Sequence, residues 1–395
     1  MTNARFIRLT KYWHQLPWLS AYLRDRITKS LRKDSGDIKR YIFVIANHFE
    51  PAWSKDGNLP LDKQLKRLEK WNKAARQIGT RLTDSDGMPF RHTNFYPAEQ
   101  YHKEILNMLA DLQSEGFCEV EVHLHHGVER PDTSNNLKFV LEEFRDCLAE
   151  EHKCLSRKSD DPMPKYAFVH GNLALGNSAN GRFCGVDNEL EILRDTGCYA
   201  DFTLPSAPDI SQVPVVNQIY QSGLPLSTCA PHKKAQPLTN NSSLTSSPVI
   251  FTGPLMIGWR LKQHRFPFPY IEDGALSASQ GLSKLRFSLW ANADISITQR
   301  PDWIFIKLYC HGFFDQDMPY CIGGTAEHFF SKLIDESNRT GKFTVHFAVA
   351  REAYNILAAA LDGHSGNPHH YRDYLLTPIM NYKHNGDISP KSTTN

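Results

Sequence analysis

The sequence predicts an α/β fold in which parallel strands alternate with helices. Nearly continuous apolar segments rich in β-branched and aromatic residues, such as 40–46 and 303–310, have the composition of strands buried on both faces. Amphipathic helical segments lie between them, and this alternation is typical of βαβ units with right-handed crossovers. Several strands end in His, Glu, Asn or Ser, and in such folds the carboxyl ends of the strands meet at one rim, where ligands bind.

The composition is that of an ordinary soluble globular protein. The 395 residues are enough for one large domain or two, and 41% of them are hydrophobic while 22% are charged. A net charge of +2 argues against a dedicated nucleic-acid binder. No apolar run reaches the length of about 18 residues that suggests a membrane span.

Cysteine usage and the first residues bear on the compartment. The eight cysteines are scattered without a C-x-x-C pair, which favours reduced thiols in a cytoplasm over a disulfide framework. No continuous apolar segment resembles a secretory signal, so we expect a cytoplasmic protein. Residues 1–39 form an arm in which basic residues alternate with aromatic and aliphatic ones. Such an arm could make peripheral contact with an anionic membrane surface, but a helix packed on its own domain is the favoured interpretation.

The first expected strand, 40–46, ends abruptly in the polar segment Asn47-His48-Phe49-Glu50-Pro51. Strand alternation places His48 and Glu50 on one face, and proline ends the strand. The elements expected next are the helix 61–78, the strand 92–97 and the helix 98–115, which Gly116 ends.

The segment 119–127, EVEVHLHHG, alternates too regularly for a loop. Its apolar residues share one face of a strand, while Glu119, Glu121, His123 and His125 share the other, and His126 begins the turn. Imidazoles clustered at the end of a strand can hold a metal ion, since neutral imidazole is a common ligand for zinc. The alternative is a polar strand whose histidines bond to neighbours or water.

The second half of the chain repeats the pattern of strands that end in polar groups. The strand 166–170 ends in His170, and the strand 303–310 is followed by His311. Residues 227–248, rich in Ser, Thr, Asn and Pro, are expected to form a long mobile insertion. The other expected elements are the helices 136–152, 189–196, 325–338 and 351–361, the strands 200–204, 249–252 and 343–349, and a tail over 363–395 that is partly disordered.

These strand ends carry the residues that a metal hydrolase needs. Such an enzyme uses about three protein ligands and an open position for water. The best set of metal ligands is His48, His123 and His125. Glu50 lies where a general base beside the metal is needed. His311 fits the general acid that protonates the leaving group. Further candidates are Asn47 and Asn172, for orienting substrate or an oxyanion, and His170 and Asp187, beside the substrate or the metal.

Each of these residues also has a purely structural interpretation. Glu50 could be paired with a nearby Lys or Arg, and Asp187 could be a loop residue or a helix N-cap. Trp53, Trp259 and Trp303 could stack on sugars, but core packing is the more common use of any one tryptophan. The sequence has neither a phosphate-binding P-loop nor a G-x-S-x-G nucleophile motif.

The order of these segments resembles the polysaccharide deacetylase (NodB-like) superfamily over about residues 40–360. The resemblance rests on Val44-Ile-Ala-Asn-His-Phe-Glu50, Thr93-Asn-Phe-Tyr-Pro97, the histidine strand, Ile306-Lys-Leu-Tyr-Cys-His311 and Val345-His-Phe-Ala-Val-Ala-Arg-Glu-Ala-Tyr354. The sequence departs from the family at the first motif, where Asn47 and His48 replace paired aspartates. At the second motif, His125 or His126 must replace the family's more widely spaced histidine.

The resemblance implies a distorted (β/α) barrel over 40–362 and a divalent metal ion, with zinc expected. It also implies a hydrolase that removes an acetyl group from a sugar or glycan precursor, with ligands drawn from His48, His123, His125 and His126. Two alternatives remain open. One is a metal-independent glycoside hydrolase that uses Glu50 and Asp187. The other is a non-catalytic glycan-binding or scaffold protein in polysaccharide biosynthesis.

Overall fold

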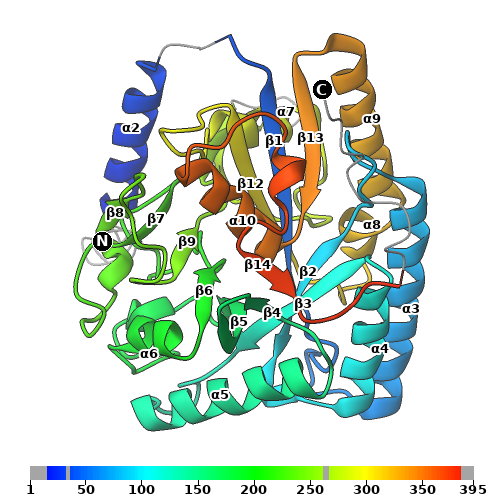
Figure 1. Cartoon of the computed structure of the whole chain (residues 1–395), viewed down its shortest axis with the longest axis vertical. Helices are drawn as coiled ribbons and strands as arrows, with labels where there is room; N and C mark the ends of the chain where they lie inside the picture. Colours follow the sequence, from blue (N-terminus) through cyan, green and yellow to red (C-terminus); the bar gives the residue numbers. More distant parts are fainter. Residues whose placement is uncertain (1–15, 33–35, 261–266, 384–395) are drawn as a thin grey trace, which may run out of the picture.

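The computed structural model describes residues 16–32, 36–260 and 267–383. Within these ranges strands and helices alternate as the sequence predicts (Figure 1). The helices are α2 (Leu16–Ser30), α3 (Leu61–Arg81), α4 (Lys103–Ser114), α5 (Ser134–Glu150), α6 (Glu189–Asp195), α7 (Lys284–Asn292), α8 (Met318–Cys321), α9 (Gly324–Thr340) and α10 (Ala350–Leu361). Short 3-10 helices are η2 (Ala98–Gln100), η3 (Leu175–Asn177), η4 (Pro231–Lys233) and η5 (Pro368–Tyr371).

The strands belong almost entirely to one sheet. They are β1 (Lys39–His48), β2 (His92–Pro97), β3 (Cys118–Leu124), β4 (Ser156–Lys158), β5 (Asp161–His170), β6 (Cys198–Asp201), β7 (Ile219–Ser222), β8 (Ala235–Pro237), β9 (Val249–Phe251), β12 (Trp303–Cys310), β13 (Phe343–Ala348) and β14 (Leu376–Pro378). A separate antiparallel pair consists of β10 (Met256–Arg260) and β11 (Phe268–Glu272).

The sheet is mixed, mostly parallel and strongly curled into a half-barrel (Figure 1). Its strand order is β12-β1-β2-β3-β5-β6-β9-β7-β8, and every neighbouring pair from β12 to β9 is parallel. The antiparallel strands β7 and β8 continue the sheet beyond β9. The expectation of parallel strands joined by helices is therefore confirmed, and these strands form the curled half-barrel.

Alternating side chains of β1 bind the two layers of the fold together. Phe43 and Ile45 belong to the outer core, which lies beneath helices such as α3, α4 and α9. Ile42 and Val44 belong to an inner core formed against α10. Every residue of α10 is buried, because this helix lies within the curl of the sheet rather than outside it (Figure 1).

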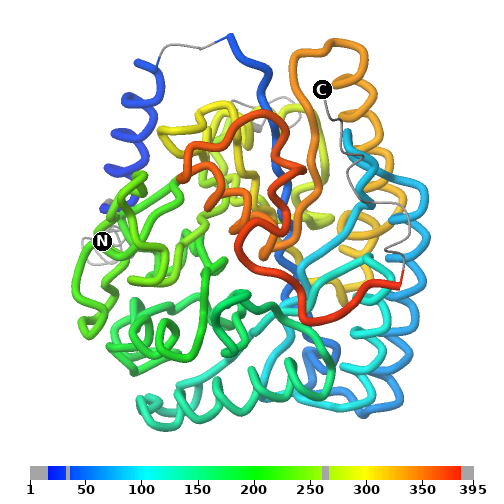
Figure 2. The backbone as a smooth tube through the Cα atoms, in the orientation of Figure 1, coloured from blue at the N-terminus to red at the C-terminus, as the bar shows by residue number. Residues whose placement is uncertain are grey.

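The chain after α10 crosses the front of the molecule, as the red segment of Figure 2 shows. Strand β14 pairs with β4, and Asn355 donates hydrogen bonds to the carbonyl groups of Arg372 and Leu376. Residues 363–383 are thus part of the fold, although the sequence alone suggested a tail from 363 onwards. The rest of that tail, 384–395, lies outside the described residues.

The insertion expected at 227–248 contains regular structure. It forms η4 and the edge strand β8, which pairs with β7. The side chain of Gln221 on β7 donates to the carbonyl groups of Ser243 and Ser247 and so fastens the segment. The polar composition did not predict this structure, because the segment is held by hydrogen bonds to the preceding strand β7 rather than by periodic apolar residues.

The arm contributes α2, which packs on the domain through Trp18 and Tyr22. This agrees with the favoured interpretation for its described part, and residues 1–15 lie outside the described residues. Leu23 and Ile27 are 59% and 62% exposed, so α2 keeps one apolar strip free of the core. Among the described residues, no helix combines the length and apolarity that a membrane crossing requires.

Candidate functional site

The carboxyl ends of β1, β3, β5 and β12 bring the predicted histidines to one end of the sheet. Four of them form a chain of neighbouring rings. The ring centroid of His48 lies 5.0 Å from that of His123 and 4.7 Å from that of His311. His123 is in turn 4.7 Å from His125. The convergence at one rim therefore holds for residues that are far apart in the sequence.

Glu50, His123 and His125 form the first candidate metal group, called here the rim group. Glu50 Oε1 lies 3.4 Å from His123 Nε2 and 3.0 Å from His125 Nε2. The side chain of His123 is fully buried, while those of Glu50 and His125 are 11% and 21% exposed. All three ligand atoms therefore face one another at the edge of the solvent.

Both histidines of the rim group are oriented by a hydrogen bond at Nδ1, the ring nitrogen away from Glu50. His123 Nδ1 donates to the carbonyl oxygen of Val169 at 2.9 Å, and His125 Nδ1 donates to Glu99 Oε1 at 2.6 Å. These bonds place a proton on each Nδ1 and direct Nε2 toward Glu50. Metal-binding histidines have this arrangement in general, since an outer carbonyl or carboxylate fixes the ring and its tautomer.

The spacing of the rim group suits a metal ion. Nitrogen and oxygen atoms bound to a tetrahedral zinc at about 2.0–2.1 Å lie roughly 3.3–3.5 Å from each other. The distances of 3.4 and 3.0 Å from Glu50 to the two Nε2 atoms are close to this separation. Two histidines and one glutamate are also a ligand set of catalytic zinc sites. The residues therefore fit a divalent ion.

A small pocket adjoins the rim group. It has a volume of about 160 Å³ and is lined by His48, His311, Tyr309, Asp273 and Thr203, among others. Tyr309 donates to Asp273 Oδ2 at 2.8 Å, which fixes both side chains on its wall. The pocket is thus next to a possible metal ion and contains two of the predicted catalytic or ligand histidines.

An aromatic surface leads away from His311. The ring of Phe314 stacks on His311 at 5.7 Å, and Trp53 packs edge-on against Phe314 at 4.8 Å. Trp53 is 39% exposed, whereas Trp303 is fully buried in the inner core. Trp53 is therefore placed beside the site, whereas Trp303 serves core packing and Trp259 is exposed on β10.

Burial and charge set the protonation of the rim residues. Burial raises the pKa of Glu50, but its hydrogen bonds with His123 and His125 outweigh burial and leave it well below the ordinary value. Burial lowers the pKa of His125, but the bonds to Glu50 and Glu99 outweigh it and raise the pKa to about 9. Burial, then the neighbouring His311 and His123, hold the pKa of His48 well below 6.5.

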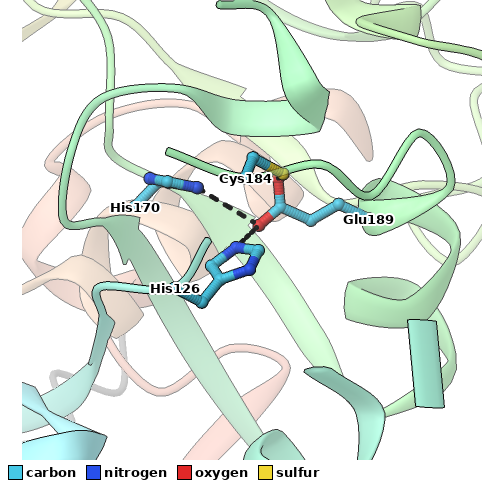
Figure 3. Close-up of side chains that lie close together, drawn as sticks. All are labelled: His126, His170, Cys184 and Glu189. Atoms are coloured by element: carbon cyan, nitrogen blue, oxygen red, sulfur yellow. Dashed lines mark hydrogen bonds and ion pairs between the residues drawn. The ribbon is translucent and has the colours of Figure 1, made fainter. Parts of the chain in front are cut away.

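His126 belongs to a second group, with His170, Cys184 and Glu189, which could also hold a metal ion (Figure 3). Strand alternation explains the separation of His126 from His123 and His125. Leu124 faces the outer core, so His126, two residues later, continues on that side, as His170 follows Phe168 on β5. We call these four residues the buried group.

Two of the remaining predicted residues, Asn47 and Asp187, have structural partners. The side-chain amide of Asn47 donates to Asn94 and its oxygen accepts from the backbone N–H of Gly312, so the residue ties β1 to β2 and to the turn after β12. Asp187 accepts from Asn177 at 2.7 Å, which agrees with its interpretation as a loop residue. Asn172, just after the end of β5, has a buried side-chain nitrogen with no hydrogen-bond partner in the described part of the chain.

Sequence reasoning missed Glu99, Cys184 and Glu189. Glu99 follows the end of β2 by two residues, so the rule that found the histidines at the other strand ends could have found it. Cys184 lies in the irregular loop between β5 and α6, where no periodicity predicts which way a side chain points. Glu189 starts α6 and resembles, from sequence alone, an ordinary acidic residue in a first turn.

Searches of protein-family models, of curated proteins and of solved structures found no match to this chain.

Proposed function

We propose that the protein is a metal-dependent hydrolase of the polysaccharide deacetylase type, acting on an acetylated sugar or glycan. The observation that carries this proposal is the rim group, in which two histidines, each fixed through Nδ1, present Nε2 to one oxygen of Glu50. A divalent ion at this position would activate water and polarise the acyl carbonyl group. The pocket beside the rim group supplies a place for the acyl group of a substrate.

The assignment of roles differs from the one that the sequence suggests. Glu50 Oε1 is directed at both Nε2 atoms, so Glu50 is proposed as a ligand together with His123 and His125. His48 and His311 are the groups proposed to move protons, since both line the pocket and their rings are 4.7 Å apart. One of them accepts a proton from the attacking water and the other donates a proton to the leaving sugar oxygen or nitrogen.

Two features support a carbohydrate as the substrate. Trp53 and Phe314 form an aromatic surface that begins at His311, and aromatic faces suit the apolar faces of sugar rings. The polar residues Thr203, Ser206 and Asp273 line the pocket and provide hydrogen-bonding groups for hydroxyls. The deacetylase-type barrel and the removal of acetyl groups both rest on the family resemblance and are part of this proposal.

The test combines metal analysis with assays of acetate release. Purified protein loaded with zinc and freed of excess metal is compared with His123→Ala, and with His328→Ala on exposed α9 as the matched control. We expect wild type and the control to release acetate from N- or O-acetylated oligosaccharides, and the His123 variant to lose both activity and its rim metal.

A His123→Ala variant that keeps the full metal content of wild type would contradict the rim assignment. Metal-free wild-type protein that releases reducing sugar rather than acetate would point instead to glycoside hydrolysis through carboxylates such as Glu50.

A further inference from the structure

We propose that the buried group, His126, His170, Cys184 and Glu189, is a closed zinc site that fastens the loop between β5 and α6. This site goes beyond the proposed hydrolase activity, because it would be a structural centre on the outer face of the sheet. All four side chains point toward one another in Figure 3. Their ligand atoms lie within 4.8 Å of one another, and all four residues are buried.

The first argument is that the two ring nitrogens of His170, Nδ1 and Nε2, are buried and lack hydrogen-bond partners among the residues that the structure describes. The side chain as a whole is fully buried. An unpaired polar group in the interior costs free energy, so buried histidines normally have partners. Nε2 of His170 lies 3.8 Å from Glu189 Oε1, which is too long for a hydrogen bond but compatible with two ligands of one ion.

The other distances fit the same ion. His126 Nε2 lies 2.9 Å from Glu189 Oε1, and Cys184 Sγ lies 3.6 Å from Glu189 Oε2. Around a tetrahedral zinc, with bonds of about 2.0–2.1 Å to nitrogen or oxygen and about 2.3 Å to sulfur, such separations are roughly 3.3–3.6 Å. The observed values fall on both sides of this range, so small movements of side chains complete the site.

Charge and outer contacts are those of a structural zinc site. A Cys184 thiolate and a Glu189 carboxylate carry two negative charges, which a divalent cation neutralises in the interior. His126 Nδ1 bonds to Asp132 at 3.1 Å, so an outer carboxylate directs Nε2 to the centre. Glu189 Oε2 also accepts from the backbone N–H of Gly176 at 2.5 Å, which holds the carboxylate in place. Four protein ligands and no exposed side indicate a structural site rather than a catalytic one.

The loop that these ligands fasten, residues 171–188, has an unusual backbone. Leu173 and Phe183 have φ values of 61° and 62°, in the left-handed region that non-glycine residues other than Asn and Asp rarely adopt. The loop also docks tightly, because a Cβ atom at Gly127 would lie 2.2 Å from the carbonyl oxygen of Cys184. Such a conformation persists only where surrounding contacts hold it, and a bound ion would supply them.

The buried site would also support the rim group. Gly171, the first residue of the loop, lies so close to His125 that an added Cβ would be 2.3 Å from the imidazole carbon Cδ2. Gly171 and Leu173 also line the small pocket. An ordered loop therefore keeps His125 in position and shapes one wall of the pocket.

Cobalt substitution tests the proposal, because the buried group contains a cysteine and the rim group does not. Bound to sulfur, Co²⁺ absorbs in the near ultraviolet through ligand-to-metal charge transfer, and nitrogen and oxygen ligands do not give this band. We expect the band in the wild-type chain loaded with Co²⁺, in His123→Ala and in Cys147→Ser. Cys147 is the control because it lies near His152 and Glu151 in a separate, more exposed cluster. The band is expected to disappear in Cys184→Ser.

Zinc content separates this proposal from the hydrolase proposal. Cys184→Ser should bind about one equivalent less zinc than wild type and retain the metal that His123→Ala removes. A chelator should lower the melting temperature of His123→Ala, through the remaining buried zinc, but not that of the double variant His123→Ala/Cys184→Ser, in which neither group holds zinc. If the Cys184 variant does not fold, the wild-type cobalt spectrum still decides. A wild-type spectrum without the thiolate band, or a band that persists in Cys184→Ser, would overturn the assignment.

Discussion

Replacement of Lys307 by methionine should stabilise the protein at neutral and acidic pH. Lys307 lies on β12, is 2% exposed and donates to the carbonyl oxygen of Leu204 at 2.8 Å. Burial lowers its pKa from 10.5 to about 7, although Asp201 and Asp273 raise it. Methionine has a similar length and no charge, so the variant removes the buried ammonium group while keeping most of the packing.

The size and sign of the effect follow from the change in pKa. The unfolded chain holds the proton of Lys307 between pH 7 and 10.5 and the folded chain does not, so stability rises with pH in this window. Below pH 7 the full cost is present, about 5 kcal/mol at ~1.36 kcal/mol per pH unit from 10.5 to about 7. Loss of the bond to Leu204 costs about 1–3 kcal/mol. The variant should therefore gain about 2–4 kcal/mol near pH 6.

The gain should shrink as the pH rises. Above pH 7 the wild-type lysine sheds its proton, and the gain from replacing it disappears toward pH 10.5. Burial also raises the pKa of Asp201 to about 7, and in the variant this carboxylate loses the attraction of Lys307, which reduces the gain further. Urea unfolding at about pH 6, 8 and 9.5 measures the difference, with exposed Lys66→Met as the control. A difference that is constant with pH, or a variant less stable near pH 6, would refute the reasoning.

Two further substitutions probe the rim group and the opposite end of the sheet. Glu99→Gln removes the carboxylate charge that His125 Nδ1 contacts, so the zinc affinity of the rim group, measured by competition with a chelator, should fall about 10–100-fold. The exposed control Glu104→Gln should leave this affinity unchanged. Equal affinities in wild type and Glu99→Gln would argue against a rim ion. Arg351→Leu leaves the buried carboxylate of Glu119 without its ion-pair partner at 2.7 Å, so the free energy of unfolding in urea should fall by about 3–5 kcal/mol. A fall below about 1 kcal/mol would mean that the hydrogen bond from Tyr382 is enough to stabilise the Glu119 carboxylate.

Strand periodicity predicted much of the fold and part of the site. The apolar segments at β1, β5 and β12 marked the strands because a parallel strand covered on both faces has to be apolar along its length. Their polar ends marked the rim, where His48, His123, His125 and His311 indeed lie together. The same period of two could have separated His126 from His125, since adjacent strand positions face opposite sides of a sheet.

Other features depend on contacts that no local pattern records. The helix α10 is buried on every side within the curl of the sheet, and its sequence does not say that it lies inside rather than outside. Cys184 and Glu189 meet His126 and His170 only because an irregular loop folds back onto the sheet. The role proposed for Glu50 depends on such contacts too. Its position after β1 suggested a general base, whereas the distances from its Oε1 to Nε2 of His123 and of His125 favour a metal ligand.

The pairing of β1 with two strands from late in the chain has a consequence for how the chain folds. Its partners β12 and β13 come near the end of the described chain, and the bond between Arg40 and Asp302 joins residues 262 positions apart. Closing such long loops delays the contacts that they bring, so folding is expected to be slow. Most of β1 should stay unpaired until most of the chain has left the ribosome, because the early strand β2 pairs only with its last residues. During synthesis the apolar segment Ile42–Ala46 would then be an open edge, and protection of that edge by chaperones would affect the yield of native protein.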